Sequence, residues 1–109
     1  MSQKNNPLEL YILGLIKKLD KYARLSRASG ASYDIADINN EYLYIEAKQQ
    51  LTKKNVTIDK NTWDKLLGEV PLHKAHLKPP VLIIENKFHD RFAVMDLEDF
   101  FRLLTKALK

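Results

Sequence analysis

The sequence predicts an α/β domain in which a central mixed sheet of five strands is flanked by helices. Three observations lead to this class. Apolar residues recur at helical spacing near both ends of the chain and around Trp63, residues 81–84 are apolar at every position, and other short segments alternate with period two. At 109 residues the chain is long enough for one core and too short for two, so we expect a single domain over residues 1–109.

The N-terminal half is expected to contain a helix followed by three short strands. The helix runs from Pro7 to Tyr22, with lysines gathered in its last turn. A first strand follows over residues 22–27 and a second over residues 33–38, which leads to a tight turn at Asn39-Asn40. The returning strand, residues 43–48, completes a hairpin.

The C-terminal half is expected to contain a helix, two strands and a final helix. The first of these helices begins at an N-cap provided by Asp59 or Asn61 and breaks near residues 68–71, where Pro71 removes a backbone donor. The run at 81–84 has the pattern of a strand buried on both faces, and a hairpin joins it to a strand at 91–95. Asp96 then caps an amphipathic helix. Its apolar stripe consists of Leu97, Phe100, Leu103, Leu104 and Leu108.

The charge balance favours an anionic partner. Lys and Arg outnumber Asp and Glu by 18 to 14, which gives a net charge of +4. The absence of cysteine excludes disulfides, thiolate zinc sites and cysteine nucleophiles, and it fits a cytoplasmic protein. No apolar run approaches the length of about 20 residues that crosses a bilayer, so no membrane partner is expected.

A candidate metal site lies in the predicted hairpin. Asp34 follows a Ser-Gly-rich turn, and Glu46-Ala47-Lys48 begins twelve positions later. Glu46 and Lys48 share one face of their strand, because strand side chains alternate. Two carboxylates, with the backbone carbonyl of Ala47, can hold Mg²⁺ beside a polarised water, and Lys48 supplies positive charge. Asp37 is the alternative first carboxylate; we favour Asp34 because it directly follows the turn.

Basic residues near this hairpin are candidates for a phosphate path. Neutralisation of phosphates by Lys and Arg dominates sequence-independent affinity for DNA. The same residues would also suit the ordinary surface of a soluble protein, and the salt dependence of binding would separate the two interpretations. The candidate DNA-binding side chains of this kind are Arg24, Arg27, Lys53 and Lys54.

The order of these motifs resembles the PD-(D/E)XK nuclease superfamily, in particular its archaeal and phage Holliday junction resolvase branch. The similarity spans residues 8–104 and rests on five segments. They are Leu8-Glu9-Leu10, the Ser29-Gly30-Ala31-Ser32 turn with Asp34-Ile35, Tyr44-Ile45-Glu46-Ala47-Lys48, Trp63 on a helix, and Pro80-Val81-Leu82-Ile83-Ile84 before the closing helix.

The resemblance implies a restriction-endonuclease-type core of three layers and a homodimer that binds branched or four-way DNA and nicks it with Mg²⁺, with Mn²⁺ as an alternative. It also implies that Glu9 joins Asp34, Glu46 and Lys48 as a catalytic residue. Arg27 and the hydroxyl groups of Ser29 and Ser32 would lie near the scissile phosphate. The sequence therefore predicts a structure-selective endodeoxyribonuclease. Two alternatives stay open: a related nuclease acting on duplex or single-stranded ends, and a basic DNA-binding module without activity.

Overall fold

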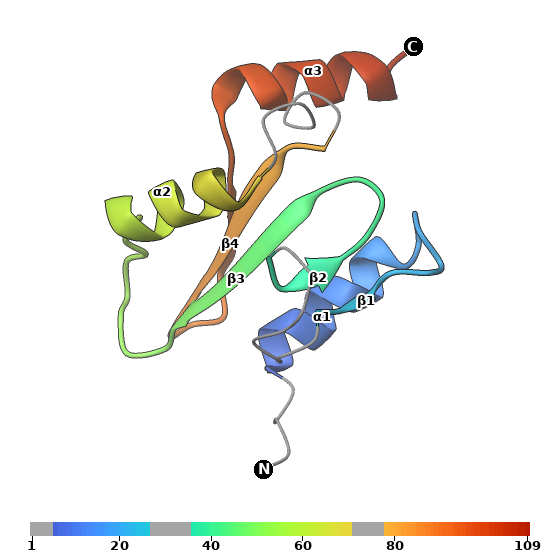
Figure 1. Ribbon diagram of the computed structural model, residues 1–109. Helices are drawn as coiled ribbons and strands as arrows, with labels where there is room; N and C mark the ends of the chain where they lie inside the picture. Colours follow the sequence, from blue (N-terminus) through green and yellow to red (C-terminus); the bar gives the residue numbers. More distant parts are fainter. Residues whose placement is uncertain (1–5, 27–35, 71–77) are drawn as a thin grey trace.

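The computed structural model describes residues 6–26, 36–70 and 78–109, and Figure 1 shows how their helices and strands are arranged. Within these ranges the strands form a five-stranded sheet in the order β1-β2-β3-β4-β5. Strands β3 and β4 are parallel and the other neighbours are antiparallel, so the predicted mixed sheet is confirmed. In chain order the elements are α1 (Pro7–Ile16), β1 (Arg24–Leu25), β2 (Ile38–Asn39), β3 (Tyr44–Gln50), α2 (Lys60–Glu69), β4 (Pro80–Asn86), β5 (Arg91–Val94) and α3 (Leu97–Ala107).

Helix α1 covers one face of the sheet. Asn6 caps it by accepting a hydrogen bond from Leu8 N at 2.8 Å, and Pro7 occupies the first turn, where its missing donor costs nothing. Its buried face is Leu8, Ile12 and Ile16, and this face packs against Ile38, Ile45 and Ala47. Alternate residues of the strands therefore form the core on the α1 side.

The first helix is shorter than predicted. It ends at Ile16 rather than at Tyr22, so the lysines assigned to its last turn lie beyond it. Leu19 N bonds to Ile16 O in a tighter turn, and Asp20 accepts hydrogen bonds from Tyr22 N at 3.0 Å and from Glu41 N at 2.8 Å. An Asp side chain that captures backbone N–H groups competes with helix continuation, and this competition overrides the apolar spacing.

Helix α2 lies on the opposite face of the sheet, so the helices and the sheet form three layers (Figure 1). Asp59, one of the two predicted candidates, is its N-cap and accepts a hydrogen bond from Asn61 N at 3.1 Å. The helix ends at Glu69 because Val70, which precedes a proline, is extended. Leu66 packs with Leu82 and Ile84 of β4. The predicted end of the helix near residues 68–71 and the predicted buried strand at residues 81–84 are both confirmed.

Strand β4 carries a buried charge that is fully neutralised. Glu85 has only 2% of its surface exposed, and it lies against Gln49, His89 and Arg91 at 2.8, 3.2 and 3.1 Å. Burial alone would raise its pKa, but hydrogen bonds from Gln49 and His89 and the charge of Arg91 lower it below the ordinary value. Glu85 thereby links β3, β4 and β5 at one end of the sheet.

The hairpin between β2 and β3 differs in detail from the prediction. Strand β2 is Ile38–Asn39, so Asn39 lies in the strand and the turn is formed by residues 40–43. Asn40 is buried and organises this turn with its side chain. Its Oδ1 accepts from Tyr42 N and Leu43 N at 2.8 and 2.9 Å, and its Nδ2 donates to Ile38 O and Leu43 O at 3.2 and 2.8 Å. This is an Asx-type turn, in which the Asn side chain itself hydrogen-bonds the backbone of the turn.

Helix α3 begins at the predicted cap, since Asp96 accepts a hydrogen bond from Asp99 N at 3.1 Å. Its predicted apolar stripe does not join the core: within the described part of the chain, no residue of α3 is buried. No helix in the described ranges is long and apolar enough to span a bilayer.

The Asn40 turn yields a test of the hairpin. Replacing Asn40 by Ala leaves several buried backbone groups without partners, so we expect Asn40→Ala to lower the free energy of unfolding by about 2–3 kcal/mol. Asn40→Asp retains the two accepted hydrogen bonds and, once its carboxyl group is protonated at acidic pH, can donate to Ile38 O or Leu43 O, so under acidic conditions it should cost less than Asn40→Ala. Urea unfolding followed by circular dichroism measures both. Equal losses in the two variants would show that the accepted bonds contribute nothing.

Candidate functional site

Asp37 lies where β2 separates from β3. Its backbone N–H donates to Ile45 O at 2.8 Å, and its side-chain Oδ2 accepts from Ala47 N at 2.7 Å. The carboxylate thus takes the place of the main-chain carbonyl that a longer β2 would supply. The preceding residue, Ala36, has a φ of 65°, a left-handed conformation that residues with a Cβ adopt at a cost. Ala36 turns the chain at this point, so the Asp37 side chain is held at the opening of the hairpin.

Glu46 lies close to Asp37 and is strongly perturbed. Burial and the negative charge of Asp37 raise the pKa of Glu46 to about 7, and a hydrogen bond between the two carboxyl groups and the charge of Glu69 add to the effect. The positive charge of Lys48 lowers the pKa of Glu46 and so opposes these effects. Only 20% of the Glu46 side chain is exposed. Near neutral pH, Glu46 therefore readily gives up a proton if a cation arrives.

Lys48 is the nearest cation. Its Nζ lies 3.6 Å from Glu46 Oε2, and its side chain is 48% exposed. The parallel register places Glu46 beside Leu82 and Lys48 beside Ile84, so both side chains lie on the α2 face of the sheet, as the alternation predicted. The apolar neighbours Leu82 and Ile84 explain why the carboxylate is desolvated while the ammonium group reaches solvent.

The Ala47 carbonyl lies on the Asp37 side of β3. In an extended strand the N–H and C=O of one residue point to the same side, and the Ala47 N–H donates to Asp37. Its oxygen is therefore directed to the side of the strand where Asp37 lies. The use of Ala47 as a backbone ligand stays a prediction.

Glu9 reaches the same region from the other face of the sheet. It occupies the first turn of α1, and its pKa is raised by burial and by the charge of Asp37. Asp37 therefore interacts with two carboxylates, Glu9 and Glu46, that belong to different layers. An acidic residue in the first helical turn would be favoured by the helix dipole in any case, but its electrostatic contact with Asp37 adds a second role.

Helix α2 contributes side chains to the site, and the sequence reasoning did not assign most of them to it. A hollow of about 220 Å³ is lined by Glu46 and Lys48 from β3 and by one face of α2. The α2 residues are Asn61, Thr62, Lys65, Leu66 and Glu69. Their spacing of three and four residues is the signal that could have found them, because it places them on one side of a helix.

The other predicted residues fall into two groups. Asp34, Arg27, Ser29 and Ser32 lie outside the described residues. Lys53 lines a groove of about 450 Å³ that also includes Lys48, so the structure brings these two lysines to one surface. Arg24 is exposed on the edge strand β1, and Lys54 lies in the loop after β3, where its backbone oxygen accepts from Asn86 Nδ2 at 2.7 Å.

The donor atoms at the hairpin opening fit a hard divalent cation only in part. Asp37, Glu46 and the Ala47 carbonyl are oxygen donors of the kind that Mg²⁺ prefers. Among residues 6–26, 36–70 and 78–109, however, no group of three or more His, Cys, Asp and Glu side chains is arranged so that it could hold a metal ion. A two-carboxylate site completed by a backbone oxygen and waters is the arrangement that these residues allow.

Comparisons with protein-family models, curated proteins and solved structures found no match to this chain. The chemistry of the site therefore has to be inferred from the carboxylates, the lysine and the surrounding layers themselves.

The raised pKa of Glu46 predicts a pH dependence of stability. The folded protein holds this proton more tightly than the unfolded chain, for which the ordinary pKa is 4.5. The resulting stability is complete below pH 4.5 and is lost as the pH rises through about 7. Solvent screens part of this effect. Between pH 4.5 and about 7 we therefore expect the free energy of unfolding of the wild type to fall by about 1–2 kcal/mol more than that of Glu46→Gln.

Urea unfolding at a series of pH values measures this difference, with the exposed Glu41→Gln as the matched control. Mg²⁺ added at pH 7.5 should raise the melting temperature of the wild type more than that of Glu46→Gln. Identical pH profiles for the wild type and Glu46→Gln would contradict the assigned environment of Glu46.

Proposed function

We propose that this protein is a Mg²⁺-dependent, structure-selective DNA endonuclease that resolves four-way junctions by paired nicking. One observation carries the proposal: burial and the neighbouring charge of Asp37 together raise the pKa of Glu46 to about 7, and Lys48 Nζ lies 3.6 Å from Glu46 Oε2. Two neighbouring carboxylates beside a single lysine cost stability when both are ionised. Such a cost is typical of a site prepared for a cation and a phosphate.

Each residue has a distinct role in this proposal. Asp37, Glu46 and the Ala47 carbonyl hold the ion, and Glu9 supports Asp37 from the α1 side. Bound Mg²⁺ supplies a water of lowered pKa and polarises the scissile phosphate. Lys48, paired with Glu46 and open to solvent, places its ammonium group where it can orient the nucleophile and offset charge that develops on the phosphate oxygens.

The three-layer arrangement supports this function. A mixed sheet lies between α1 and α2, and the site is at the strand ends where β2 and β3 diverge. We propose that this is a restriction-endonuclease-type core, as the resemblance to the PD-(D/E)XK superfamily implies. The core on the α1 side is apolar, whereas the α2 side combines the apolar cluster of Leu66, Leu82 and Ile84 with the charged side chains of Glu46 and Lys48.

Positive charge near the site supports binding to the nucleic acid backbone. Lys65 lines the hollow that contains Glu46 and Lys48, and Lys53 lines the adjoining groove beside Lys48. Contacts of this kind follow the phosphates and carry no sequence information. Selectivity would then come from the shape of a branched substrate, with Mn²⁺ as an alternative to Mg²⁺ in the same oxygen site.

We expect Asp37→Asn and Lys48→Ala to reduce cleavage of a four-way junction in Mg²⁺ by about a hundredfold or more, because each removes a charge at the reacting phosphate. Binding in Ca²⁺ should change little. Asp64→Asn, an exposed carboxylate of α2 that pairs with Lys60, is the control and should cut normally.

The same assay distinguishes the alternatives. Asp34→Asn tests the first carboxylate favoured by sequence, and loss of cutting in that variant with full activity in Asp37→Asn would overturn the assignment of Asp37. A linear duplex of the same sequence serves as the second substrate. Selective paired nicking of the junction supports a resolvase, cutting of both substrates supports a broader nuclease, and binding without cutting supports a DNA-binding module.

Lys53 and Lys65 provide a test of the phosphate path. Each contact to a phosphate releases a counterion, so we expect Lys53→Ala and Lys65→Ala each to reduce the slope of log affinity against log salt by about one. Binding isotherms at several salt concentrations measure this slope. Lys60→Ala, whose side chain pairs with Asp64, is the matched control. A slope unchanged in all three variants would place the DNA elsewhere.

A further inference from the structure

The turn between β4 and β5, residues 87–90, presents an aromatic side chain to solvent. Phe88 is 58% exposed, and the Nζ atom of Lys87 lies 5.2 Å from the centre of its ring. Figure 1 shows this turn at the end of the sheet opposite α3. A single apolar side chain on a surface needs no explanation in itself. The turn that carries Phe88, however, is held more firmly than an ordinary connection.

Asn86 fixes the turn from the end of β4. It is only 3% exposed, and its Oδ1 accepts hydrogen bonds from Phe88 N at 2.9 Å and from Asp90 N at 3.0 Å. Its Nδ2 donates to Lys54 O at 2.7 Å and to Asp90 Oδ2 at 3.1 Å. These four bonds use the whole donor and acceptor capacity of a buried amide. The backbone of Phe88 is therefore held in one position relative to the sheet.

The other side of the turn is strained and is held by a buried charge. His89 has a φ of 63°, a left-handed conformation that costs energy in a residue with a Cβ. Its Nδ1 lies 3.2 Å from Oε2 of Glu85, which Arg91 also contacts. Backbone strain persists only where the surrounding contacts impose it, and it is concentrated at functional positions. The strain at His89 thus makes the turn a candidate for a function of its own.

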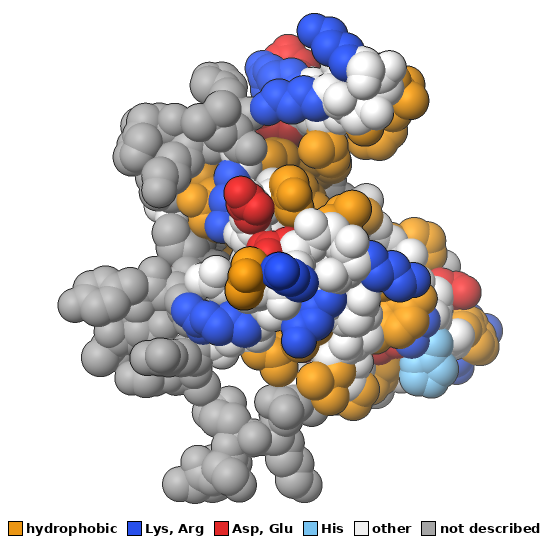
Figure 2. Space-filling view, turned by 90° about the vertical axis from the view of Figure 1, so that its right-hand side faces the viewer, with side chains coloured by type: hydrophobic (Ala, Val, Ile, Leu, Met, Phe, Trp, Pro, Cys, Tyr) orange, Lys and Arg blue, Asp and Glu red, His pale blue; other side chains and the backbone are white. Residues whose placement is uncertain are grey.

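Basic side chains surround Phe88. Lys87 N donates to Lys53 O at 2.9 Å, so the turn is docked on the loop that follows β3. Lys53, Lys54 and Lys87 are all exposed, and together with Phe88 they form a surface that we call the basic tip. Figure 2 shows a pale blue histidine side chain at the edge of the molecule, with hydrophobic and basic side chains beside it. Among the described residues this histidine is His89, the neighbour of Phe88.

An aromatic ring framed by lysines suits a nucleic acid that has an accessible base. The ammonium groups bind phosphates, and the ring stacks on the face of any base. A protein partner would be expected to cover a patch with few charged residues at its centre, whereas the ring of Phe88 lies among cations. In a linear duplex both faces of each internal base are stacked on its neighbours. At a branch point this stacking is interrupted, and the face of a base becomes accessible.

The basic tip lies a short distance along the sheet from the proposed active site. The parallel register pairs Glu46 with Leu82, and Asn86, at the start of the turn, follows four residues later, which corresponds to about 13 Å of strand. The groove of about 450 Å³ that includes Lys48 and Lys53 lies along this distance. Successive nucleotides of one strand advance by about 3.4 Å. A DNA strand that is cut at the site and follows the groove would therefore reach the basic tip after about four or five nucleotides.

We propose that Phe88 stacks on a base exposed at a branch point of DNA, and that this contact sets the distance between the branch and the cut. The inference rests on the proposed nuclease function and adds to it the part of the substrate that is recognised. The lysines of the basic tip bind phosphates and contribute affinity for any DNA. Phe88 contributes selectivity and is too far from the reacting atoms to take part in the chemistry.

Binding in Ca²⁺ in place of Mg²⁺ tests the stacking contact without cutting. The two probes are a four-way junction and a linear duplex of the same sequence. We expect Phe88→Ala to weaken junction binding by about tenfold or more, the magnitude of one base stacked on an aromatic ring, and to leave duplex binding unchanged. Phe88→Trp should retain the affinity for the junction. Phe88→Leu, which is apolar but has no ring, should lose it.

Tyr22→Ala is the matched control for Phe88→Ala. Tyr22 is 79% exposed, and the Nζ atom of Lys21 also lies 5.2 Å from its ring centre, but this pair is outside the basic tip. Junction binding should not change in this variant. The slope of log affinity against log salt should stay the same in Phe88→Ala and fall by about one in Lys87→Ala, because only the lysine releases a counterion. Circular dichroism checks that Phe88→Ala is folded, as expected for an exposed side chain.

Mapping of the nicks in Mg²⁺ tests the distance from branch to cut. The wild type should cut about four or five nucleotides from the branch point, and Phe88→Ala should spread the cuts over several positions. Equal losses of affinity for junction and duplex in Phe88→Ala would overturn the proposal, as would wild-type binding and wild-type cut positions in that variant. Either result would leave the nuclease function standing. Selective junction binding through Phe88 in a wild type that cuts no DNA would instead refute the nuclease function and support the stacking contact.

Discussion

The geometry of the site depends on one hydrogen bond, from the Ala47 N–H to the Asp37 carboxylate at 2.7 Å. This bond closes the ladder where β2 ends, and it fixes the Asp37 side chain against β3. Because a carboxylate accepts the bond, a negative charge is brought to the strand that carries Glu46. The perturbed pKa of Glu46 and that of Glu9 both include the charge of Asp37. Folding of the hairpin and assembly of the site are thus a single event.

The unfavourable interactions at the hairpin opening are offset by favourable ones elsewhere in the domain. Asp37 and Glu46 repel each other when both are ionised, and the left-handed Ala36 adds backbone strain at the same point. The apolar layer between α1 and the strands has no such conflict, and Asn40 secures the hairpin from its other end. Glu85, which is buried as deeply as the core, is neutralised by its neighbours and so adds no further repulsion. The unfavourable electrostatics are therefore confined to the hairpin opening.

The sequence predicted the layers well because each depends on local patterns. The cap at Asp59, the helix end before Pro71 and the apolar run of β4 needed no knowledge of tertiary contacts. Contacts distant in sequence were missed: Asp20 binds Glu41 N and ends α1 early, and the register Ile38↔Ile45 brings Asp37 to β3. Proximity to the Ser-Gly turn favoured Asp34, which lies outside the described residues and stays a prediction. Among the described residues, the pairing register brings Asp37 to the strand that carries Glu46.

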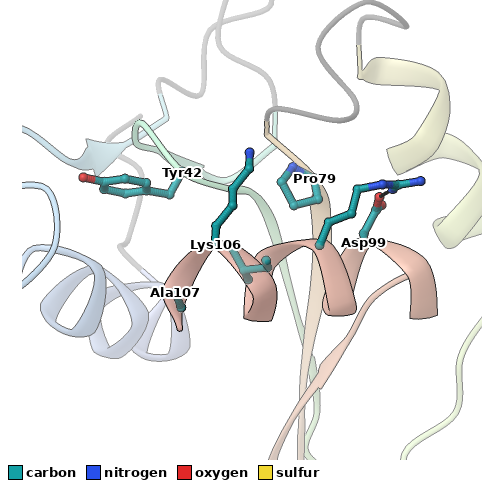
Figure 3. Close-up of a pocket in the computed structure, with 7 residues that line it drawn as sticks. Tyr42, Pro79, Asp99, Lys106 and Ala107 are labelled. Atoms are coloured by element: carbon teal, nitrogen blue, oxygen red, sulfur yellow. Dashed lines mark hydrogen bonds and ion pairs between the residues drawn. The ribbon is translucent and has the colours of Figure 1, made fainter. Parts of the chain in front are cut away.

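The final helix shows why an amphipathic pattern alone does not define a core. Its apolar stripe has the period of a buried helix, yet Leu97, Phe101 and Leu108 are each more than half exposed. The period determines which residues share one side of a helix, but it does not determine what that side contacts. The cavity beside Tyr42 and Pro79 (Figure 3) is lined by Leu103 and Ala107 as well as by Asp99, Arg102 and Lys106, so apolar and polar side chains of α3 both face it. The position of α3 depends on contacts distant in sequence, and the pattern of one helix therefore could not predict it.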